Sequence, residues 1–265
     1  MTPWSRHVHH EVVWGTVVTF DVRGPELDDR LVAAACREAA AELHRIDAWL
    51  SPFRTDSELT RLRTGDLVEV DASEPVREVL ADCRRIRSLT DGRFDPWAAP
   101  GGLDTCAYVK GWGADRAAET LLGFGLAHVS VNAAGDVTCR GRSSAELDGW
   151  RIGIVDPRDR TQVIDAVIVQ DAHLATSGST EQGGHVVDPA TGTFTTHAGS
   201  ASVLHARGGT ADALATALYV SGPSGLPALT ALDCSALVVT EHDVWSTGPA
   251  FARTDDPVSA ISTRP

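Results

Sequence analysis

A chain of 265 residues, 43% of them hydrophobic and 22% charged, has the length and composition of a globular protein with a sizeable core. Its 36 acidic and 23 basic residues give a formal net charge of −13, which argues against binding to nucleic acid or anionic lipid. Five scattered cysteines form no Cys-x-x-Cys pair, so they indicate a reducing compartment rather than a zinc ribbon. We expect a cytoplasmic protein without membrane insertion, since the longest uncharged run, 213–232, is broken by a Gly-Pro-Ser-Gly segment.

The first half of the sequence is predicted to be mostly helical. β-branched residues alternate from Val12 to Val22, which predicts one strand. Apolar residues at helical spacing predict a helix over Leu27–Leu50, ended by the following Ser-Pro, and a second helix over 73–92. Residues 96–105 look irregular, and 113–122 predict a third helix.

The second half is predicted to be rich in strands. Short β-branched runs separated by turn residues predict strands at 128–131, 136–140, 150–155, 166–169, 185–187, 201–206 and 235–240, with short helices at 211–220 and 226–232. Helices first and antiparallel-looking strands later are typical of the α+β class. We expect a single domain over 1–265, helix-rich in 1–126 and strand-rich in 127–265.

Two segments of the first half carry side chains suited to chemistry. In Gly92-Arg-Phe-Asp-Pro96 the proline fixes the backbone, so that Asp95 can be aimed at a ligand, although a plain capping turn explains the segment equally. Lys110 is the only lysine of the chain, and Gly111 follows it. A lysine at a helix entry can meet a phosphate, whereas the ordinary alternative is a surface lysine.

Three further segments lie in the second half. The small-residue turn Asn132-Ala-Ala-Gly-Asp136 allows a ligand to approach the backbone, or is a hairpin turn. The hydroxyls of 176–179 precede His185, which is either a general base or structural. Asp212 and Thr216 lie four apart on a predicted helix, so their oxygens share one face and suit a hard ion such as Mg²⁺. The alternative is a capping aspartate with a threonine that bonds back to a carbonyl.

These segments occur together in the order typical of one family. The sequence resembles the ApbE family of FAD:protein FMN transferases from Trp14 to about Gly222. The matching segments are Ile46-Asp-Ala-Trp-Leu-Ser-Pro-Phe53 with Asp56-Ser-Glu-Leu59, Gly92–Pro96, Lys110-Gly111 with Asp115, Asn132–Asp136, Ser177-Gly178, His185-Val-Val-Asp-Pro189 with Thr191-Gly192, and Ala211-Asp-Ala-Leu-Ala-Thr216. Each is modest alone, and the ordered set is specific.

The resemblance implies a fold, a substrate and a site. The fold would be ApbE-like, with N-terminal helices packed on an antiparallel sheet. FAD would be contacted by Trp14, Phe53, Arg93, Phe94, Asp95, Asp104, Lys110 and Val186. Mg²⁺ would be held by the backbone carbonyl of Ala107 and the side chains of Asp212 and Thr216, and His185 would serve in the transfer step.

The resemblance also implies an activity: Mg²⁺-dependent transfer of the FMN moiety of FAD to a threonine or serine of an acceptor flavoprotein, with release of AMP. The sequence departs from the family pattern at three places. Only 13 residues separate Pro96 from Lys110, Ala134 replaces a usual glycine, and Trp14 stands where methionine is usual. We therefore expect a shortened, cytoplasmic member, and two alternatives stay open: an FAD pyrophosphatase that gives FMN and AMP, and an FAD-binding protein without enzymatic activity.

Overall fold

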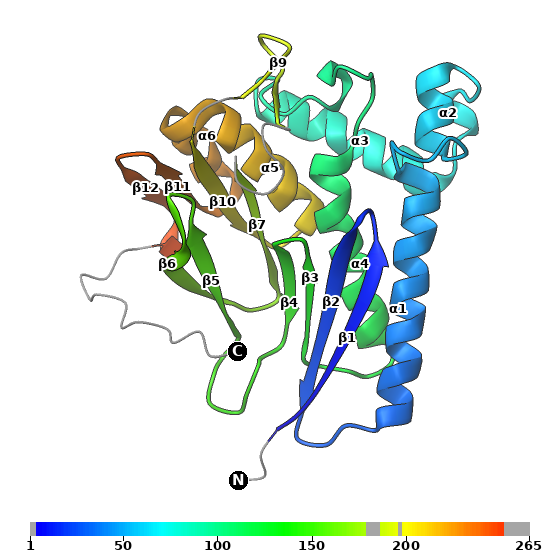
Figure 1. The fold of residues 1–265 in the computed structure, drawn as a ribbon, viewed down its shortest axis with the longest axis vertical. Helices are drawn as coiled ribbons and strands as arrows, with labels where there is room; N and C mark the ends of the chain where they lie inside the picture. The colour runs from blue at the N-terminus through cyan, green and yellow to red at the C-terminus, as the bar shows by residue number, and fades with distance from the viewer. Residues whose placement is uncertain (1–3, 179–185, 196–197, 252–265) are drawn as a thin grey trace.

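An eight-stranded antiparallel sheet organises the computed structural model, which describes residues 4–178, 186–195 and 198–251 (Figure 1). The strands follow the order β1-β2-β3-β4-β7-β10-β11-β12, so both halves of the chain contribute to the sheet. They are β1 (Ser5–Val13), β2 (Thr16–Gly24), β3 (Val129–Ala133), β4 (Asp136–Arg140), β7 (Ala172–Gly178), β10 (Gly199–His205), β11 (Ser235–Thr240) and β12 (Val244–Thr247). The antiparallel pairing agrees with the sequence-based prediction.

The prediction of a single strand over Val12–Val22 is wrong, because the chain reverses there in a tight hairpin. Val13 at the end of β1 pairs with Thr16 at the start of β2, and Trp14 and Gly15 form the turn between them. Both turn residues have positive φ, 57° for Trp14 and 70° for Gly15, as two-residue hairpin turns require. A tryptophan rarely adopts positive φ, so Trp14 itself does not indicate a turn. The alternating β-branched residues around it resemble one continuous strand.

Helices pack against one face of this sheet. They are α1 (Asp29–Leu50), α2 (Glu58–Thr64), α3 (Glu74–Leu89), α4 (Cys106–Gly123), α5 (Gly208–Ser221) and α6 (Leu226–Leu229). Short 3₁₀ turns lie at Glu69–Asp71, Pro96–Ala98, Gly222–Gly225, Thr230–Leu232 and Pro249–Phe251. Helix α1 begins where the carboxylate of Asp28 accepts the Arg30 and Leu31 N–H groups, and it ends before Pro52 as predicted.

Helix α4 begins at Cys106 rather than at residue 113, so the prediction for this helix is wrong at its start. Gly111 and Gly113 both lie inside the helix, where they allow close packing. A Cβ at Gly111 would overlap the carbonyl oxygen of Gly208 at the start of α5, and one at Gly113 would lie 2.5 Å from the Trp14 ring. Lys110 therefore lies within α4, not at its entry.

The opposite face of the sheet is covered by the hairpin of β5 (Trp150–Asp156) and β6 (Asp159–Val169) (Figure 1). Along the strands, alternate residues face the helices on one side of the sheet and the β5–β6 hairpin on the other. In β11, Ala236 and Val238 belong to the core beneath the helices, whereas Leu237 and Val239 pack with Trp150 and Ile154 of β5. A small hairpin, β8 (Val187–Asp188) with β9 (Thr193–Phe194), stands apart from the large sheet.

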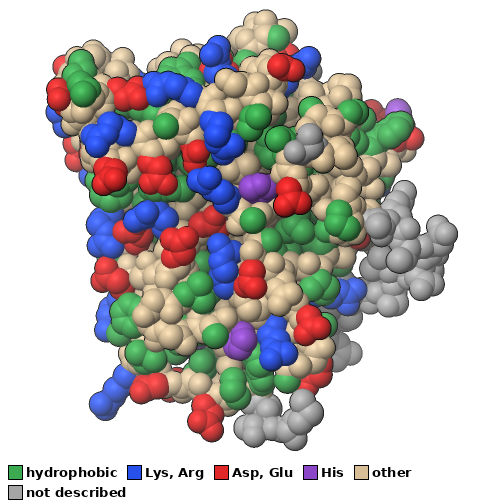
Figure 2. All heavy atoms as spheres, turned by 180° about the vertical axis from the view of Figure 1, so that it is seen from behind, with side chains coloured by type: hydrophobic (Ala, Val, Ile, Leu, Met, Phe, Trp, Pro, Cys, Tyr) green, Lys and Arg blue, Asp and Glu red, His purple; other side chains and the backbone are tan. Residues whose placement is uncertain are grey.

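The net negative charge is not visible as a single-sign surface on the side shown in Figure 2, where acidic and basic side chains are interspersed. Many charged side chains of the protein form ion pairs, such as Arg45 with Glu42 at 2.8 Å on α1. Within the described ranges, no helix combines the length and the apolar character needed to cross a bilayer.

Candidate active site

Lys110 lies between two buried carboxylates contributed by different parts of the chain. Its ammonium group forms an ion pair with Asp136 at the start of β4, and its Nζ lies 3.3 Å from Asp212 Oδ1 on α5. Both aspartates are only 2% exposed, whereas a third of the Lys110 side chain is accessible. The cluster of Lys110, Asp136 and Asp212 therefore places a cation at the boundary between two buried anions and solvent.

The close approach of α4 and α5 holds this cluster together. Because neither Gly111 nor Gly208 has a Cβ, the two helix backbones can touch. The Gly111 N–H then donates to Asp212 Oδ2 at 3.3 Å. Asp136 is held from the other side, since its Oδ1 accepts the backbone N–H of Thr176 on β7 at 3.0 Å. Backbone donors thus orient both carboxylates toward Lys110.

The charges of the cluster are unbalanced. Burial, with the charge of Asp136, raises the pKa of Asp212 to about 7, although Lys110 and the Gly111 N–H act in the opposite direction. Burial alone would lower the pKa of Lys110, but the two carboxylates outweigh it and raise that pKa above its ordinary value. Two carboxylates therefore share one ammonium group, and an additional positive charge would stabilise the site.

The residues that the resemblance assigns to a metal lie beside this cluster. Asp212 and Thr216 share one face of α5, and among the described residues neither side chain bonds a backbone group of its own helix, as the capping alternative would require. Thr216 Oγ1 lies 3.0 Å from the hydroxyl of Ser177 at the end of β7. Ala107 has a non-helical ψ of 19° within α4, and the Gly111 N–H that would bond its carbonyl in a regular helix also bonds Asp212. Carboxylate, hydroxyl and carbonyl oxygens are the donors that Mg²⁺ prefers, so these residues fit that ion.

A second hydrogen-bonded group lies behind the site, centred on Asp115 of α4. Its Oδ1 accepts from Thr138 at 2.9 Å and from Arg140 at 3.1 Å, and its Oδ2 accepts the Gly208 N–H. The hydroxyl proton of Thr138 goes to Asp115, so Thr138 accepts from His173 Nδ1 at 2.6 Å. Burial lowers the pKa of His173, which is therefore neutral. This group fixes the first turn of α5. Asp212 follows that turn on the same helix.

Four of the predicted FAD residues are hydrogen-bonded or buried within the protein itself. Asp95 accepts the Trp97 N–H at 3.0 Å and pairs with Arg87 at 2.6 Å, as in the capping interpretation of its segment. Asp104 accepts the N–H of Cys106, the first residue of α4, at 2.9 Å. Phe94 and Val186 are both buried in the core beneath the helices. Their contacts with FAD stay predictions.

The other three predicted FAD contacts besides Lys110 differ in exposure. Trp14 is half-buried at the tip of the first hairpin, where it packs against Gly113 of α4. Phe53 is 84% exposed between α1 and α2, which is unusual for an aromatic side chain and suits a stacking role. Arg93 is exposed and lines a cavity of about 160 Å³ near the C-terminal end of α5. His185, the predicted catalytic residue, lies outside the described residues.

The site contains three residues that the sequence-based assignment did not include. Asp136, Asp115 and Ser177 belong to segments that match the family, but the sequence assigns none of them a contact with FAD or the metal. For Asp136 the sequence carries only a general signal, because an aspartate that becomes buried at the start of a strand needs a partner.

Comparison with known proteins identifies relatives of one kind. A family model described as the ApbE family matches residues 14–101 and 99–238. The FAD:protein FMN transferase of Vibrio cholerae is 32% identical over 152 residues, which cover 53% of this chain and 45% of the relative. That of Haemophilus influenzae is 24% identical over 264 residues, covering 74% of this chain and 76% of the relative. The chain thus aligns with less than half of the first relative and about three quarters of the second.

Solved structures share the fold. The flavin transferase ApbE from Vibrio cholerae superimposes with a TM-score of 0.79 at 22% identity, over 92% of this chain and 97% of that chain. The ApbE protein from Thermotoga maritima gives a TM-score of 0.79 at 22% identity, over 91% of this chain and 96% of that chain. The predicted α+β, ApbE-like fold is confirmed.

Proposed function

Since the chain belongs to the ApbE family, we propose that it is an FAD:protein FMN transferase. It would transfer the FMN moiety of FAD to a threonine or serine hydroxyl of an acceptor flavoprotein and release AMP. The observation that best supports the proposal is the pairing of Lys110 with Asp136 and Asp212. Three of the family's motif segments, far apart in sequence, meet there at the edge of solvent.

The chemistry of the step requires charge neutralisation more than covalent participation. The acceptor hydroxyl oxygen forms a bond to the FMN phosphorus, the bond from that phosphorus to the bridging oxygen breaks, and AMP leaves with the bridging oxygen. Lys110 supplies positive charge to the pyrophosphate from a part-exposed position. The resemblance implies that His185 serves in the transfer step, where it would take the hydroxyl proton or orient the group that does.

Asp212, Thr216 and the carbonyl of Ala107 would hold Mg²⁺. A bound magnesium ion would neutralise pyrophosphate charge and help to orient the two phosphates. Asp212 supplies the charge that attracts a cation, and Ser177 orients the Thr216 hydroxyl. The Asp115 group positions the first turn of α5, so that Asp212 is preorganised before the ion binds. A cytoplasmic location is also part of the proposal; all five cysteines are unpaired, as in a reducing compartment.

The flavin end of FAD would meet two aromatic side chains. Phe53 is exposed and could stack on a flat ring system, and Trp14 lies in a tight turn where its ring packs against Gly113. Arg93, Phe94, Asp95, Asp104 and Val186 complete the proposed FAD site. The two aromatic residues would set the orientation of the flavin relative to the cluster.

Chromatography of the products tests this proposal. The protein is incubated with FAD and Mg²⁺, with and without a flavoprotein acceptor that carries the target threonine. AMP that forms only with acceptor, with no free FMN, supports the transferase. AMP with equimolar free FMN in both samples would support the pyrophosphatase instead. FAD that binds but stays intact in both samples would favour the non-enzymatic binding protein.

A further inference from the structure

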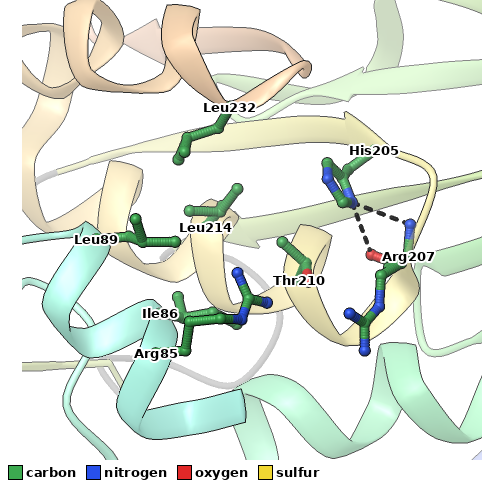
Figure 3. A pocket seen from close by; sticks show the side chains of 8 residues that line it. All are labelled: Arg85, Ile86, Leu89, His205, Arg207, Thr210, Leu214 and Leu232. Atoms are coloured by element: carbon green, nitrogen blue, oxygen red, sulfur yellow. Dashed lines mark hydrogen bonds between the residues drawn. The ribbon is translucent and has the colours of Figure 1, made fainter.

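A cavity separate from the one beside Arg93 lies on the other side of α5 from the candidate active site. It has a volume of about 210 Å³ and is bordered by α3, the first half of α5 and the end of β10 (Figure 3). Its lining residues are Arg85, Ile86, Leu89, His205, Arg207, Thr210, Leu214 and Leu232. Pockets for drug-sized ligands are roughly 300–1,000 Å³, so this cavity suits a smaller molecule than a dinucleotide.

The polar side chains that line the cavity are hydrogen-bond donors. Arg85 and Arg207 contribute two guanidinium groups, both anchored on the same carboxylate of Asp82, by Arg85 Nε at 3.2 Å and Arg207 Nη2 at 2.7 Å. His205 Nδ1 lies 2.9 Å from the Arg207 nitrogen and 3.3 Å from the Arg207 carbonyl oxygen. Because the Arg207 N–H can only donate, Nδ1 accepts it, and the proton of the neutral ring lies on Nε2 as a further donor. A chain with a net charge of −13 therefore gathers three donor side chains around one small cavity.

Thr210 gives an independent indication that the cavity is a binding site. This side chain is only 6% exposed, and its hydroxyl has no hydrogen-bond partner among the described residues. Figure 3 shows it projecting from the first turn of α5 between the guanidinium groups of Arg85 and Arg207. A buried hydroxyl without a partner costs free energy, and a ligand oxygen would satisfy it.

The remaining lining is apolar and the cavity is separate from the candidate active site. Ile86, Leu89, Leu214 and Leu232 form the apolar part. Thr210 and Leu214 are each two residues from Asp212 along α5, which turns them about 200° around the helix axis from it at 3.6 residues per turn. Asp212 and Thr216 face α4 and β7, whereas Thr210 and Leu214 face α3.

We propose that this cavity binds a small organic anion, with a phosphate or carboxylate head held by Arg85, Arg207 and Thr210 and a short aliphatic body against the leucines. Guanidinium groups bind both kinds of head in a two-pronged manner, so the head chemistry is shared. Asp82 fixes the arginines in place before the anion binds, which reduces the entropy lost on binding. The inference is independent of the transferase proposal.

Calorimetric titration of the full chain tests the site with n-butyl phosphate and butanoate, compared with inorganic phosphate and n-butanol. We expect at least one of the two butyl anions to bind saturably and at least threefold more tightly than inorganic phosphate or n-butanol. The tighter of the two butyl anions identifies the preferred head. Absence of saturable binding by both butyl anions would overturn the proposal.

Variants locate the bound anion. The double variant Arg85→Gln/Arg207→Gln should weaken binding at least tenfold, and Thr210→Val, which removes only an unpartnered hydroxyl, about threefold. Arg158→Gln serves as the matched control, since Arg158 pairs with Asp156 at the remote β5–β6 turn and should leave binding unchanged. Affinities equal to that of the unsubstituted protein in both test variants, with unfolding curves showing that they are folded, would overturn the proposal. An anion bound at Lys110 instead would give that result.

Discussion

Replacement of Lys110 by methionine should destabilise the protein far more than loss of an ordinary ion pair. The substitution keeps most of the side-chain volume but leaves Asp136 and Asp212, each 2% exposed, without their cation. Breaking a buried pair by removing one partner costs about 3–5 kcal/mol. Because a third of the Lys110 side chain is accessible, we expect the lower end of this range, about 3 kcal/mol. Loss of an exposed pair costs about 0–1 kcal/mol.

The loss in free energy of unfolding caused by Lys110→Met should depend on pH. Burial raises the folded-state pKa of Asp212 to about 7, above the ordinary value of about 4 for the unfolded chain. The protonated form therefore favours the folded state: this contribution is complete below about pH 4 and is lost as the pH rises through about 7. Lys110 lowers that pKa, so its removal should cost most above pH 7 and less at pH 5, where Asp212 in the variant is protonated.

Urea unfolding at pH 5 and pH 8 measures both effects. Arg158→Met, which removes an exposed partner of Asp156, is the matched control and should change the free energy of unfolding by less than about 1 kcal/mol at either pH. Adding Asp212→Asn to Lys110→Met should restore part of the loss at pH 8, because one unpaired carboxylate disappears. A loss no larger than that of the control, or an equal loss at pH 5 and pH 8, would refute the reasoning.

Three further predictions concern the metal residues and the backbone. Asp212→Asn and Thr216→Val should each abolish Mg²⁺-dependent AMP release in folded protein; unchanged rates over a Mg²⁺ titration would remove both from the proposed metal site. Gly111→Ala should cost about 3 kcal/mol or more in urea unfolding, because its Cβ overlaps the carbonyl oxygen of Gly208, and a smaller cost than 1 kcal/mol would contradict the close helix contact. Ala134→Gly should stabilise the protein by up to about 1 kcal/mol, since Ala134 has a φ of 55° in the β3–β4 turn; a lower melting temperature would contradict the strain.

The sequence predicts well those elements whose signals are local. The proline at position 52 and the serine at position 73 mark helix boundaries that the structure reproduces, with α1 ending at Leu50 and Ser73 as the N-cap of α3. The strands 136–140 and 235–240 agree with β4 and β11 residue by residue. These positions depend on backbone preferences and apolar spacing, which can be recognised within a few residues.

Elements that depend on distant contacts are the ones that the sequence conceals. The glycines of α4 are poor helix formers when considered locally, but they allow contact with Gly208 and Trp14. Strand β7 was not predicted, because Thr176-Ser-Gly resembles a loop and the strand is stabilised by pairing with β4 and β10. Trp14 lies in a turn that only the pairing of β1 with β2 explains.

In the candidate site, too, local features were predicted and distant contacts were not. Asp212 and Thr216 were predicted to share a helix face from their spacing alone, and α5 places them so. The partners of Lys110 are 26 and 102 residues away, so their meeting could not be derived from spacing. From the sequence, only the ordered motifs of the family indicate that these segments belong to one site.

The central claim, transfer of FMN to an acceptor, is tested most directly by intact mass spectrometry. A flavoprotein acceptor is incubated with this protein, FAD and Mg²⁺, and AMP is measured in the same sample. The account predicts that the acceptor gains the mass of one FMN less one water, with one AMP for each modified acceptor, and that Asp212→Asn abolishes both. AMP and free FMN with no gain in acceptor mass would contradict it.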